Sequence, residues 1–208
     1  MKVNNKNLGL VTKKFNDFFL VDLKNQETYL NSEKFLCKVR KSINFKNQFI
    51  YVGDEVEIKN IDLKSKRAVI TSVKKRKNLL VRPSVANISN IYITFSVEEP
   101  ALNLSQVNRF LISAESIGVE VSLVLTKCDL ISDKSRYLLI DKFEKWGYKA
   151  ITLNLEKSDD FNNLLVELKQ KECSIFMGPS GVGKTTLLNM IIPGLQNSTA
   201  PVLSLIHI

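Results

Sequence analysis

The sequence is poor in the residues that build most metal and disulfide sites. Its 208 residues include three cysteines, one histidine and one tryptophan. Cys37, Cys128 and Cys173 are odd in number, lie far apart and form no Cys-x-x-Cys pair, which excludes a disulfide framework and predicts no zinc site. We expect reduced, structural thiols. The lone histidine, His207, has no cysteine or carboxylate cluster beside it, and we assign it no role as ligand or base.

The chain also lacks a long hydrophobic run. No uninterrupted apolar segment approaches the ~20 residues that span a bilayer, and the start MKVNNKNLGL lacks the apolar stretch of a secretory signal. We therefore expect a cytoplasmic protein with no membrane partner. With 44% hydrophobic and 25% charged residues the chain can bury a core, and its length favours two domains.

The formal charge of +9 is unevenly distributed along the chain. Residues 1–77 carry 18 Lys and Arg against 8 Asp and Glu, whereas residues 78–208 carry 12 against 13. The basic first third suggests a module that binds a polyanion, joined to a near-neutral segment with another task. The basic run at 74–77 is compatible with RNA contact or with a solvated linker, and charge alone does not separate the two.

The basic segment contains short strands and no sustained helical period. Five β-rich pieces are separated by polar stretches, at residues 8–12, 18–23, 35–39, 55–58 and 68–73. Five strands in about 75 residues fit a small OB-type barrel, a fold whose exposed face often binds oligonucleotides. Phe45, Phe49 and Tyr51 are candidates for stacking on RNA, although barrel core is the expected place for most of them.

Past Pro83, apolar strands alternate with helical periods. We expect strands at 90–97, 119–125, 149–153 and 173–177, and helices at 104–117, 134–146, 161–171 and 185–192. This alternation predicts a parallel sheet covered on both faces, with ligands at the carboxyl ends of its strands. The loops after Leu125 and Met177 are therefore the places to seek chemistry. Trp146 is expected to pack on a helix rather than to stack on a base.

The loop after the last of these strands, GPSGVGKTT, matches GxxxxGK followed by Thr. It comprises Gly178, Pro179, Ser180, Gly181, Val182, Gly183, Lys184, Thr185 and Thr186. Glycines let backbone N–H groups turn around a phosphate, Lys184 supplies a cation for the β- and γ-phosphates, and the Thr185 hydroxyl can ligate Mg²⁺. The alternative is a Gly-rich turn with an incidental lysine, but the full pattern between a strand and a helix favours a nucleotide. Pro193 and Gly194 are expected to end that helix.

The loop after the second strand favours guanine. It consists of Thr126, Lys127, Cys128 and Asp129. The Asp129 carboxylate can accept hydrogen bonds from both the ring N–H and the exocyclic amine of guanine, whereas adenine presents it with an acceptor. The stem of Lys127 can lie along the base while its ammonium extends toward the phosphate loop. Lys-x-Asp sequences are common in solvated turns, but this one ends a strand of the same predicted sheet.

The order of the two motifs is the reverse of that in an ordinary GTPase. Asp129 precedes Gly178 by 49 residues. Because a sheet needs its strands adjacent in space and not in a particular chain order, a permuted chain can build the same pocket. The order therefore indicates a circular permutation.

Taken in this order, the motifs resemble the ribosome small-subunit-dependent GTPases, bacterial assembly factors with an OB barrel, a circularly permuted GTPase domain and a C-terminal zinc-binding domain. The resemblance covers residues 1–202 and rests on the segments at 52–54, 82–87, 97–100, 126–129, 178–186 and 192–195. It implies a barrel at 1–75, a connector at 76–88 and a GTPase domain at 89–202. It also implies a monomer that hydrolyses GTP with Mg²⁺ on the small ribosomal subunit, during late maturation, with the barrel on ribosomal RNA.

Three features depart from this resemblance. Thr126 stands where such loops usually have Asn, and we expect its hydroxyl to replace only part of what the amide does. The loop that usually carries a Ser-Ala pair behind the base reads TLNLE at 152–156, and we assign no residue there. The switch segment, the Asp-x-x-Gly and the zinc domain do not follow the phosphate loop, so zinc is expected only in such a missing domain. We expect weak guanine-nucleotide binding and poor GTP hydrolysis.

The last six residues, 203–208, also leave the resemblance. They match a translation of CTGTCTCTTATACACATC, which looks like a transposon-end sequencing adapter, and we expect a non-native tail. Two rival functions remain. GPSG also resembles guanylate kinases, but those begin with this loop, whereas here 177 residues precede it. The second rival is a non-catalytic RNA-binding module with a degenerate second domain.

Overall fold

The computed structural model describes residues 7–23, 33–40, 49–81, 83–154, 158–192 and 203–206. The chain forms two compact units, and the division falls between Ile88 and Ser89. The segment that the sequence suggested as a connector, 76–88, therefore belongs to the first unit. None of the helices in the described ranges has both the length and the apolar character that crossing a bilayer requires.

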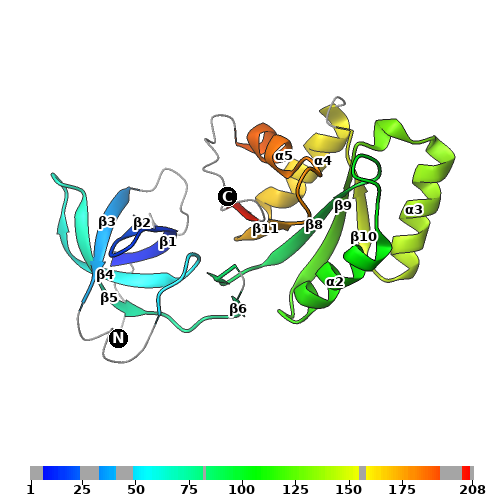
Figure 1. Ribbon diagram of the computed structural model, residues 1–208. Helices are drawn as coiled ribbons and strands as arrows, with labels where there is room; N and C mark the ends of the chain where they lie inside the picture. Colours follow the sequence, from blue (N-terminus) through cyan, green and yellow to red (C-terminus); the bar gives the residue numbers. More distant parts are fainter. Residues whose placement is uncertain are drawn as a thin grey trace. The chain divides into compact units, whose positions relative to one another are not determined.

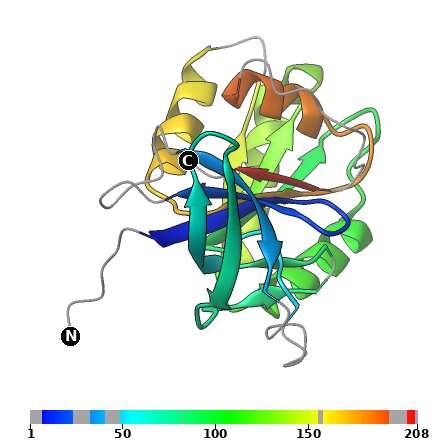
Figure 2. The ribbon, with the colours of Figure 1, turned by 90° about the vertical axis from the view of Figure 1, so that its left-hand side faces the viewer.

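The first unit is built around a closed five-stranded barrel (Figures 1 and 2). Its strands are β1 (Leu8–Lys14), β2 (Phe19–Leu23), β3 (Lys34–Val39), β4 (Glu55–Asp62) and β5 (Arg67–Val73), in the order β1-β2-β3-β5-β4. Neighbours pair antiparallel except β3 and β5, which are parallel. This is the predicted OB-type barrel, and closure leaves it without an exposed sheet edge.

Alternate residues of the barrel strands point inward and form the core. Fully buried members include Val11, Val21, Phe35, Val56, Ile58 and Ile70. Phe49 does not join them: it is 68% exposed, because its neighbour Ile50 takes the inward position at 4% exposure. Barrel core was expected for most of the three aromatic candidates, and Phe49 is not a core residue. Tyr51 is half-buried beneath the guanidinium of Arg76, and Phe45 lies outside the described residues.

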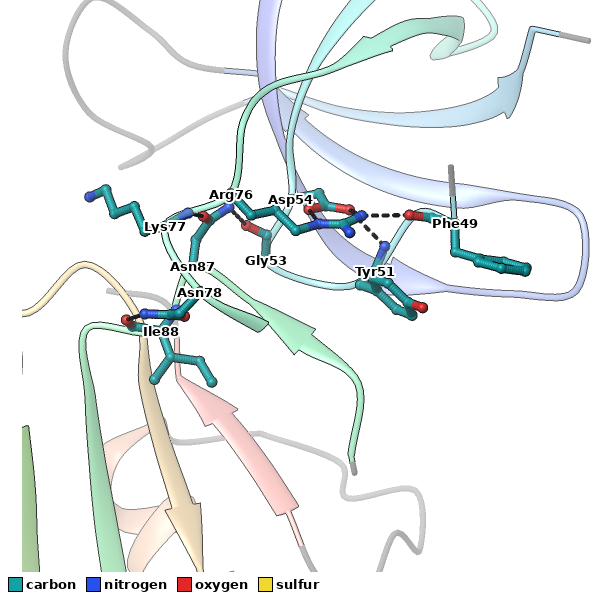
Figure 3. A network of polar contacts seen from close by, with 9 residues as sticks. All are labelled: Phe49, Tyr51, Gly53, Asp54, Arg76, Lys77, Asn78, Asn87 and Ile88. Carbon is teal, nitrogen blue, oxygen red and sulfur yellow. Dashed lines mark hydrogen bonds and ion pairs between the residues drawn. The ribbon is translucent and has the colours of Figure 1, made fainter. Parts of the chain in front are cut away.

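The end of the first unit is latched onto the barrel turn at residues 51–54 (Figure 3). Arg76 donates from Nε and Nη2 to the two carboxylate oxygens of Asp54, at 2.6 and 2.8 Å, and Asp54 is fully buried. Asn87 donates to the Gly53 carbonyl at 2.8 Å. Gly53 has a φ of 87°, and a Cβ there would lie 2.1 Å from the Ala86 carbonyl oxygen, so the turn requires glycine.

The basic run at 74–77 is therefore not a solvated linker. Lys74 pairs with Glu57 at 3.1 Å and Arg76 pairs with Asp54, whereas Lys75 and Lys77 are exposed. The segment then forms a small hairpin of β6 (Leu79–Leu80) and β7 (Val85–Ala86). Asn78 closes it by bonding both the N–H and the C=O of Ile88 at 2.8 Å (Figure 3).

The second unit is a mainly parallel sheet covered by helices. Its strands are β8 (Asn90–Ser96), β9 (Glu120–Thr126), β10 (Lys149–Thr152), β11 (Ser174–Met177) and β12 (Leu203–Ile206), in the order β10-β9-β8-β11-β12. The first four are parallel, as predicted, and β12 is antiparallel to β11. Residues 203–206, expected to be a non-native tail, thus form an edge strand. Pro193 and Gly194 lie outside the described residues.

Helices lie on both faces of this sheet (Figure 1). They are α2 (Leu104–Glu115), α3 (Asp133–Lys145), α4 (Ser158–Lys169) and α5 (Lys184–Ile191). Leucines of α4 and α5 pack with Tyr92, Val124 and Phe176 on one face, whereas Phe110 of α2 meets Phe95 of the opposite face edge-on. Trp146 ends α3 and packs edge-on against Phe143.

Chain order places a topological switch point between β8 and β11. The chain proceeds from β8 to β9 and β10 on one side, then returns to β11 on the other side of β8. In open parallel sheets, ligands bind outside the carboxyl ends of the strands at such a point. The loops that follow β8, β9 and β11 therefore define the candidate site.

The three cysteines are buried in the two units. All are buried thiols, and burial raises the pKa of Cys37 and of Cys173 to about 12. A thiol with so high a pKa is overwhelmingly protonated at neutral pH and is inert. This agrees with the structural role expected for them.

Candidate functional site

The phosphate-loop motif leaves β11 in close contact with β8. Gly178 has a φ of 152°, and a Cβ there would lie 2.1 Å from the carbonyl oxygen of Thr94. Gly183 has a φ of 86° immediately before α5 begins at Lys184. The first and last glycines of the motif thus permit a tight turn from strand to helix. Any residue with a side chain in place of Gly178 would clash with β8.

Lys184 lies inside this loop. It is 8% exposed, and its ammonium donates a hydrogen bond to the Pro179 carbonyl. Burial lowers the pKa of Lys184, because desolvation disfavours its charged form. A partly desolvated ammonium at the start of a helix forms a strong anion site, since an incoming phosphate replaces the lost hydration.

Thr185 and Thr186 occupy the first turn of α5 with exposed side chains. Magnesium takes one or two protein oxygens and completes its octahedron with water and phosphate oxygens, so a single accessible hydroxyl at Thr185 fits that donor set. Within the described ranges, no group of three or more His, Cys, Asp and Glu residues is placed to hold a metal ion.

The loop after β9 brings the second motif to the same edge. Thr126 is the last residue of β9 and is fully buried, while Lys127 adopts a left-handed conformation with a φ of 56°. A 3₁₀ turn follows over Cys128–Leu130. In that turn Cys128 is buried and Asp129 is exposed, with no ion pair to Asp129 among the described residues. The carboxylate is therefore available to a ligand.

A buried hydrogen bond joins the two motifs. Thr126 Oγ1 donates to the Val182 carbonyl at 2.7 Å, and it lies 3.3 Å from the Phe95 carbonyl. Two segments 56 residues apart in the chain are thus held together at one edge of the sheet. The hydroxyl thus braces the loop after β9 against the phosphate-loop motif, and it points into the protein rather than toward solvent.

A third loop, residues 97–102 after β8, completes this edge. The Lys127 ammonium donates to the carbonyl of Glu99, and Pro100 Cδ lies 3.7 Å from the position that a Cβ on Gly181 would take. Ser96 Oγ donates to the Pro100 carbonyl at 2.7 Å. From the sequence, residues 97–100 counted toward the family resemblance but were given no role in the site. Their place after the first strand of a switch point was the signal for one.

The remaining loop contributes no assigned residue. Leu153 and Asn154 are buried at the end of β10, and residues 155–157 lie outside the described ranges. The contacting loops present groups of two kinds to a ligand. The helix-start amides and Lys184 suit an anion, whereas the exposed Asp129 carboxylate suits a pair of N–H donors.

This chain resembles known proteins in sequence and in structure. A family model described as RsgA GTPase matches residues 73–205. A relative from Prochlorococcus marinus (strain NATL1A), named small ribosomal subunit biogenesis GTPase RsgA, is 37% identical over 206 residues, which is 96% of this chain and 66% of the relative. A relative of the same name from Synechococcus sp. (strain CC9605) is 38% identical over 169 residues, covering 81% and 56%. The chain thus spans at most 66% of the length of these two relatives.

Two crystal structures share the fold. YjeQ from Thermotoga maritima superposes with a TM-score of 0.78 at 32% identity, over 91% of this chain and 66% of that one. YloQ, described as a circularly permuted GTPase, gives a TM-score of 0.75 at 24% identity, over 93% and 68%. The barrel, the permuted order of the two loops and the family match agree, and the chain belongs to the RsgA GTPase family.

Proposed function

We propose that this chain binds a guanine nucleotide with Mg²⁺ and hydrolyses GTP. The observation that carries the proposal is the Thr126 to Val182 hydrogen bond, which holds the base-reading loop against the phosphate loop. A single nucleotide can then reach both loops at once. The family match supports the same function.

The phosphates belong at Gly178 to Thr186. The loop amides and the Lys184 ammonium neutralise the β- and γ-phosphate oxygens, and Thr185 gives Mg²⁺ one oxygen ligand. When phosphate enters, Lys184 exchanges the Pro179 carbonyl for charged oxygens. Water then attacks the γ-phosphorus as the bond to the β-phosphate oxygen breaks, which yields GDP and inorganic phosphate. A Mg²⁺ ion held by the Thr185 hydroxyl would supply further positive charge to neutralise the phosphates.

The base belongs at Asp129 and Lys127. The exposed Asp129 carboxylate accepts from the ring N–H and the exocyclic amine of guanine, and the Lys127 stem lies along the ring. Thr126 acts from behind this loop and does not touch the base, because its hydroxyl is already donated to Val182. Cys128 packs beneath the turn and carries no chemical role.

We further propose that the chain acts as a monomer in the cytoplasm on the small ribosomal subunit, with the barrel on ribosomal RNA. Relatives that carry this subunit in their names support the partner. On the barrel, a cluster that we call the hairpin-tip cluster has no carboxylate ion pair among the described residues. It consists of Lys13, Lys14, Lys38 and Arg40, all exposed, beside Phe15, which is 51% exposed.

The hairpin-tip cluster suits single-stranded RNA. Lys14 lies over the Phe19 ring at 5.9 Å and Lys38 over the Phe18 ring at 5.1 Å, so cations and aromatic faces gather where β1, β2 and β3 meet. Four other cations of this unit are paired with carboxylates: Lys34, Lys66, Lys74 and Arg76. Cations free of carboxylates release counterions from RNA, and the exposed ring of Phe15 can stack on its bases.

The test compares the intact chain with Lys184→Ala in two separate assays. We expect the variant to lose GTP binding and turnover while it binds small-subunit RNA as the parent does. An RNA-binding parent without measurable GTP binding would instead support the non-catalytic module. Phosphorylation of GMP in an assay with ATP would support the guanylate-kinase rival.

A further inference from the structure

The loop at residues 97–102 stands between the two motifs without belonging to either. It follows β8 directly, and the Val97 N–H donates to the Thr126 carbonyl at 3.1 Å, so the loop leaves the sheet beside the base-reading loop. Its far side meets the phosphate loop, where the Pro100 ring packs near Gly181. The loop therefore has contacts with both halves of the proposed nucleotide site.

The loop also contacts the side chain of Lys127. Its ammonium is held by the Glu99 carbonyl, and both residues have left-handed backbones, with φ of 56° at Lys127 and 50° at Glu99. Such conformations are costly for residues other than Gly, Asn and Asp. They persist where the surroundings impose them, and sites of this kind cluster around ligands.

Ser96 anchors the loop to the sheet. Its side chain is 1% exposed, and its hydroxyl donates to the Pro100 carbonyl at 2.7 Å. Ser96 is the last residue of β8 and pairs in register with Thr126. The hydrogen bond therefore ties the Pro100 carbonyl, one residue beyond Glu99, to the strand position that pairs with Thr126, the residue before Lys127.

We propose that residues 96–100 position Lys127 for the guanine nucleotide, with Ser96 as the positioning residue and the Glu99 carbonyl as the acceptor. This inference rests on the proposed function and adds a third loop to the site. A lysine side chain has many rotamers, and it packs well along the base only when a few of them are populated. The Glu99 carbonyl holds the ammonium before ligand arrives, so binding loses less conformational freedom.

The experiment measures the dissociation constant of a fluorescent GDP analogue for four forms of the full chain: parent, Ser96→Ala, Lys127→Met and the double variant. Ser96→Ala should weaken binding about three- to tenfold, the range expected for one lost hydrogen bond. In the Lys127→Met background the same substitution should cost less than twofold, because the residue it positions is gone. Ser116→Ala, which removes a 2.7 Å hydroxyl-to-carbonyl bond at the end of α2, is the matched control and should change nothing.

The unfolding temperature of each ligand-free form separates positioning from loss of structure. We expect Ser96→Ala to unfold close to the parent, since Pro100 is an exposed residue whose carbonyl can bond to solvent in place of the hydroxyl. Equal fold-losses in the two backgrounds, or no loss in either, overturn this inference while GDP binding by the parent leaves the proposed function intact. A parent that binds no guanine nucleotide overturns both.

Discussion

The hydroxyl of Thr126 donates a 2.7 Å hydrogen bond to the carbonyl oxygen of Val182. Thr126 is fully buried, so this bond forms in a region of low dielectric where it is stronger than at the surface. It explains how a loop with Thr in place of the usual Asn still joins the base-reading and phosphate-binding halves of the site. In the proposed site, the base is then read by Lys127 and Asp129.

Thr126→Val tests this brace. Valine keeps the shape and removes the donor, which leaves the buried Val182 carbonyl without this partner, at a cost of about 1 to 3 kcal/mol. We expect a lower unfolding temperature and GDP binding weakened about fivefold or more. Thr126→Ser retains the hydroxyl and should stay near the parent in both measurements. Equal affinity for the Val and Ser variants would show that the brace contributes nothing to binding.

Lys184→Met tests the electrostatics of the phosphate loop. Burial lowers the pKa of Lys184 in the folded, ligand-free protein, so below that pKa the buried charge destabilises the fold, and the penalty disappears as pH rises toward the ordinary lysine range. The neutral variant should therefore unfold at the same or a higher temperature than the parent at pH 7. Thermal scans from pH 7 to 10 should show the unfolding temperatures of the parent and the variant converging.

The same Lys184→Met variant should lose the rise in unfolding temperature that GDP gives the parent, because the cation that meets the phosphates is gone. A Lys184→Met variant that is less stable than the parent without ligand, yet is still stabilised by GDP, would contradict both expectations, the one for stability and the one for GDP binding.

Arg76→Met tests the latch between the barrel turn and the end of the first unit. Removing the guanidinium leaves the buried Asp54 carboxylate without its cation, which we expect to cost about 3 kcal/mol or more in the free energy of unfolding. Arg76→Met combined with Asp54→Asn should recover part of that loss, since no buried charge remains. Lys75→Met, at the exposed neighbouring position, should change stability by about 0.5 kcal/mol or less, as measured in urea.

Lys38→Gln and Lys66→Gln form a matched pair for the hairpin-tip cluster. Each ammonium lies over a phenylalanine ring, at 5.1 and 5.3 Å, but only Lys66 also pairs with a carboxylate, that of Glu33 at 3.0 Å. If Lys38 meets an RNA phosphate, its loss lowers the slope of log affinity against log salt by about 0.7 for single strands. Lys66→Gln should leave the slope nearly unchanged. Equal slopes for the two variants would place the RNA elsewhere.

Local sequence patterns predicted the elements of both units because burial imposes a period on each. The alternation around Val11, Val21 and Phe35 marks the barrel, and the helix-strand alternation after residue 90 marks the parallel sheet. Bounds differ by a few residues where polar ends continue an element, as in β4, which runs on to Asp62 through exposed positions. Two-residue strands such as β6 and β7 carry no period to detect.

No local sequence pattern predicts the contacts between residues that lie far apart in the chain. Arg76 and Asp54 lie 22 residues apart, and the basic run around Arg76 resembles any solvated run until its partner is seen. Likewise the backbone carbonyl of Glu99 accepts a hydrogen bond from the Lys127 ammonium, a contact that no side-chain motif encodes. The phosphate and base loops were recognisable because their chemistry resides in particular residue types at fixed spacing.

Asp129→Asn most directly tests the claim that this permuted site reads guanine. The parent should bind GDP in preference to XDP and ADP. The variant should lose about 100-fold or more in GDP affinity, since two charge-assisted hydrogen bonds are lost, and should prefer XDP, whose 2-oxo group accepts from the Asn amide. Displacement of a fluorescent guanine nucleotide by GDP, XDP or ADP measures the affinity for each of the three. A parent that binds ADP as well as GDP, or a variant that keeps its preference for GDP, would contradict the account.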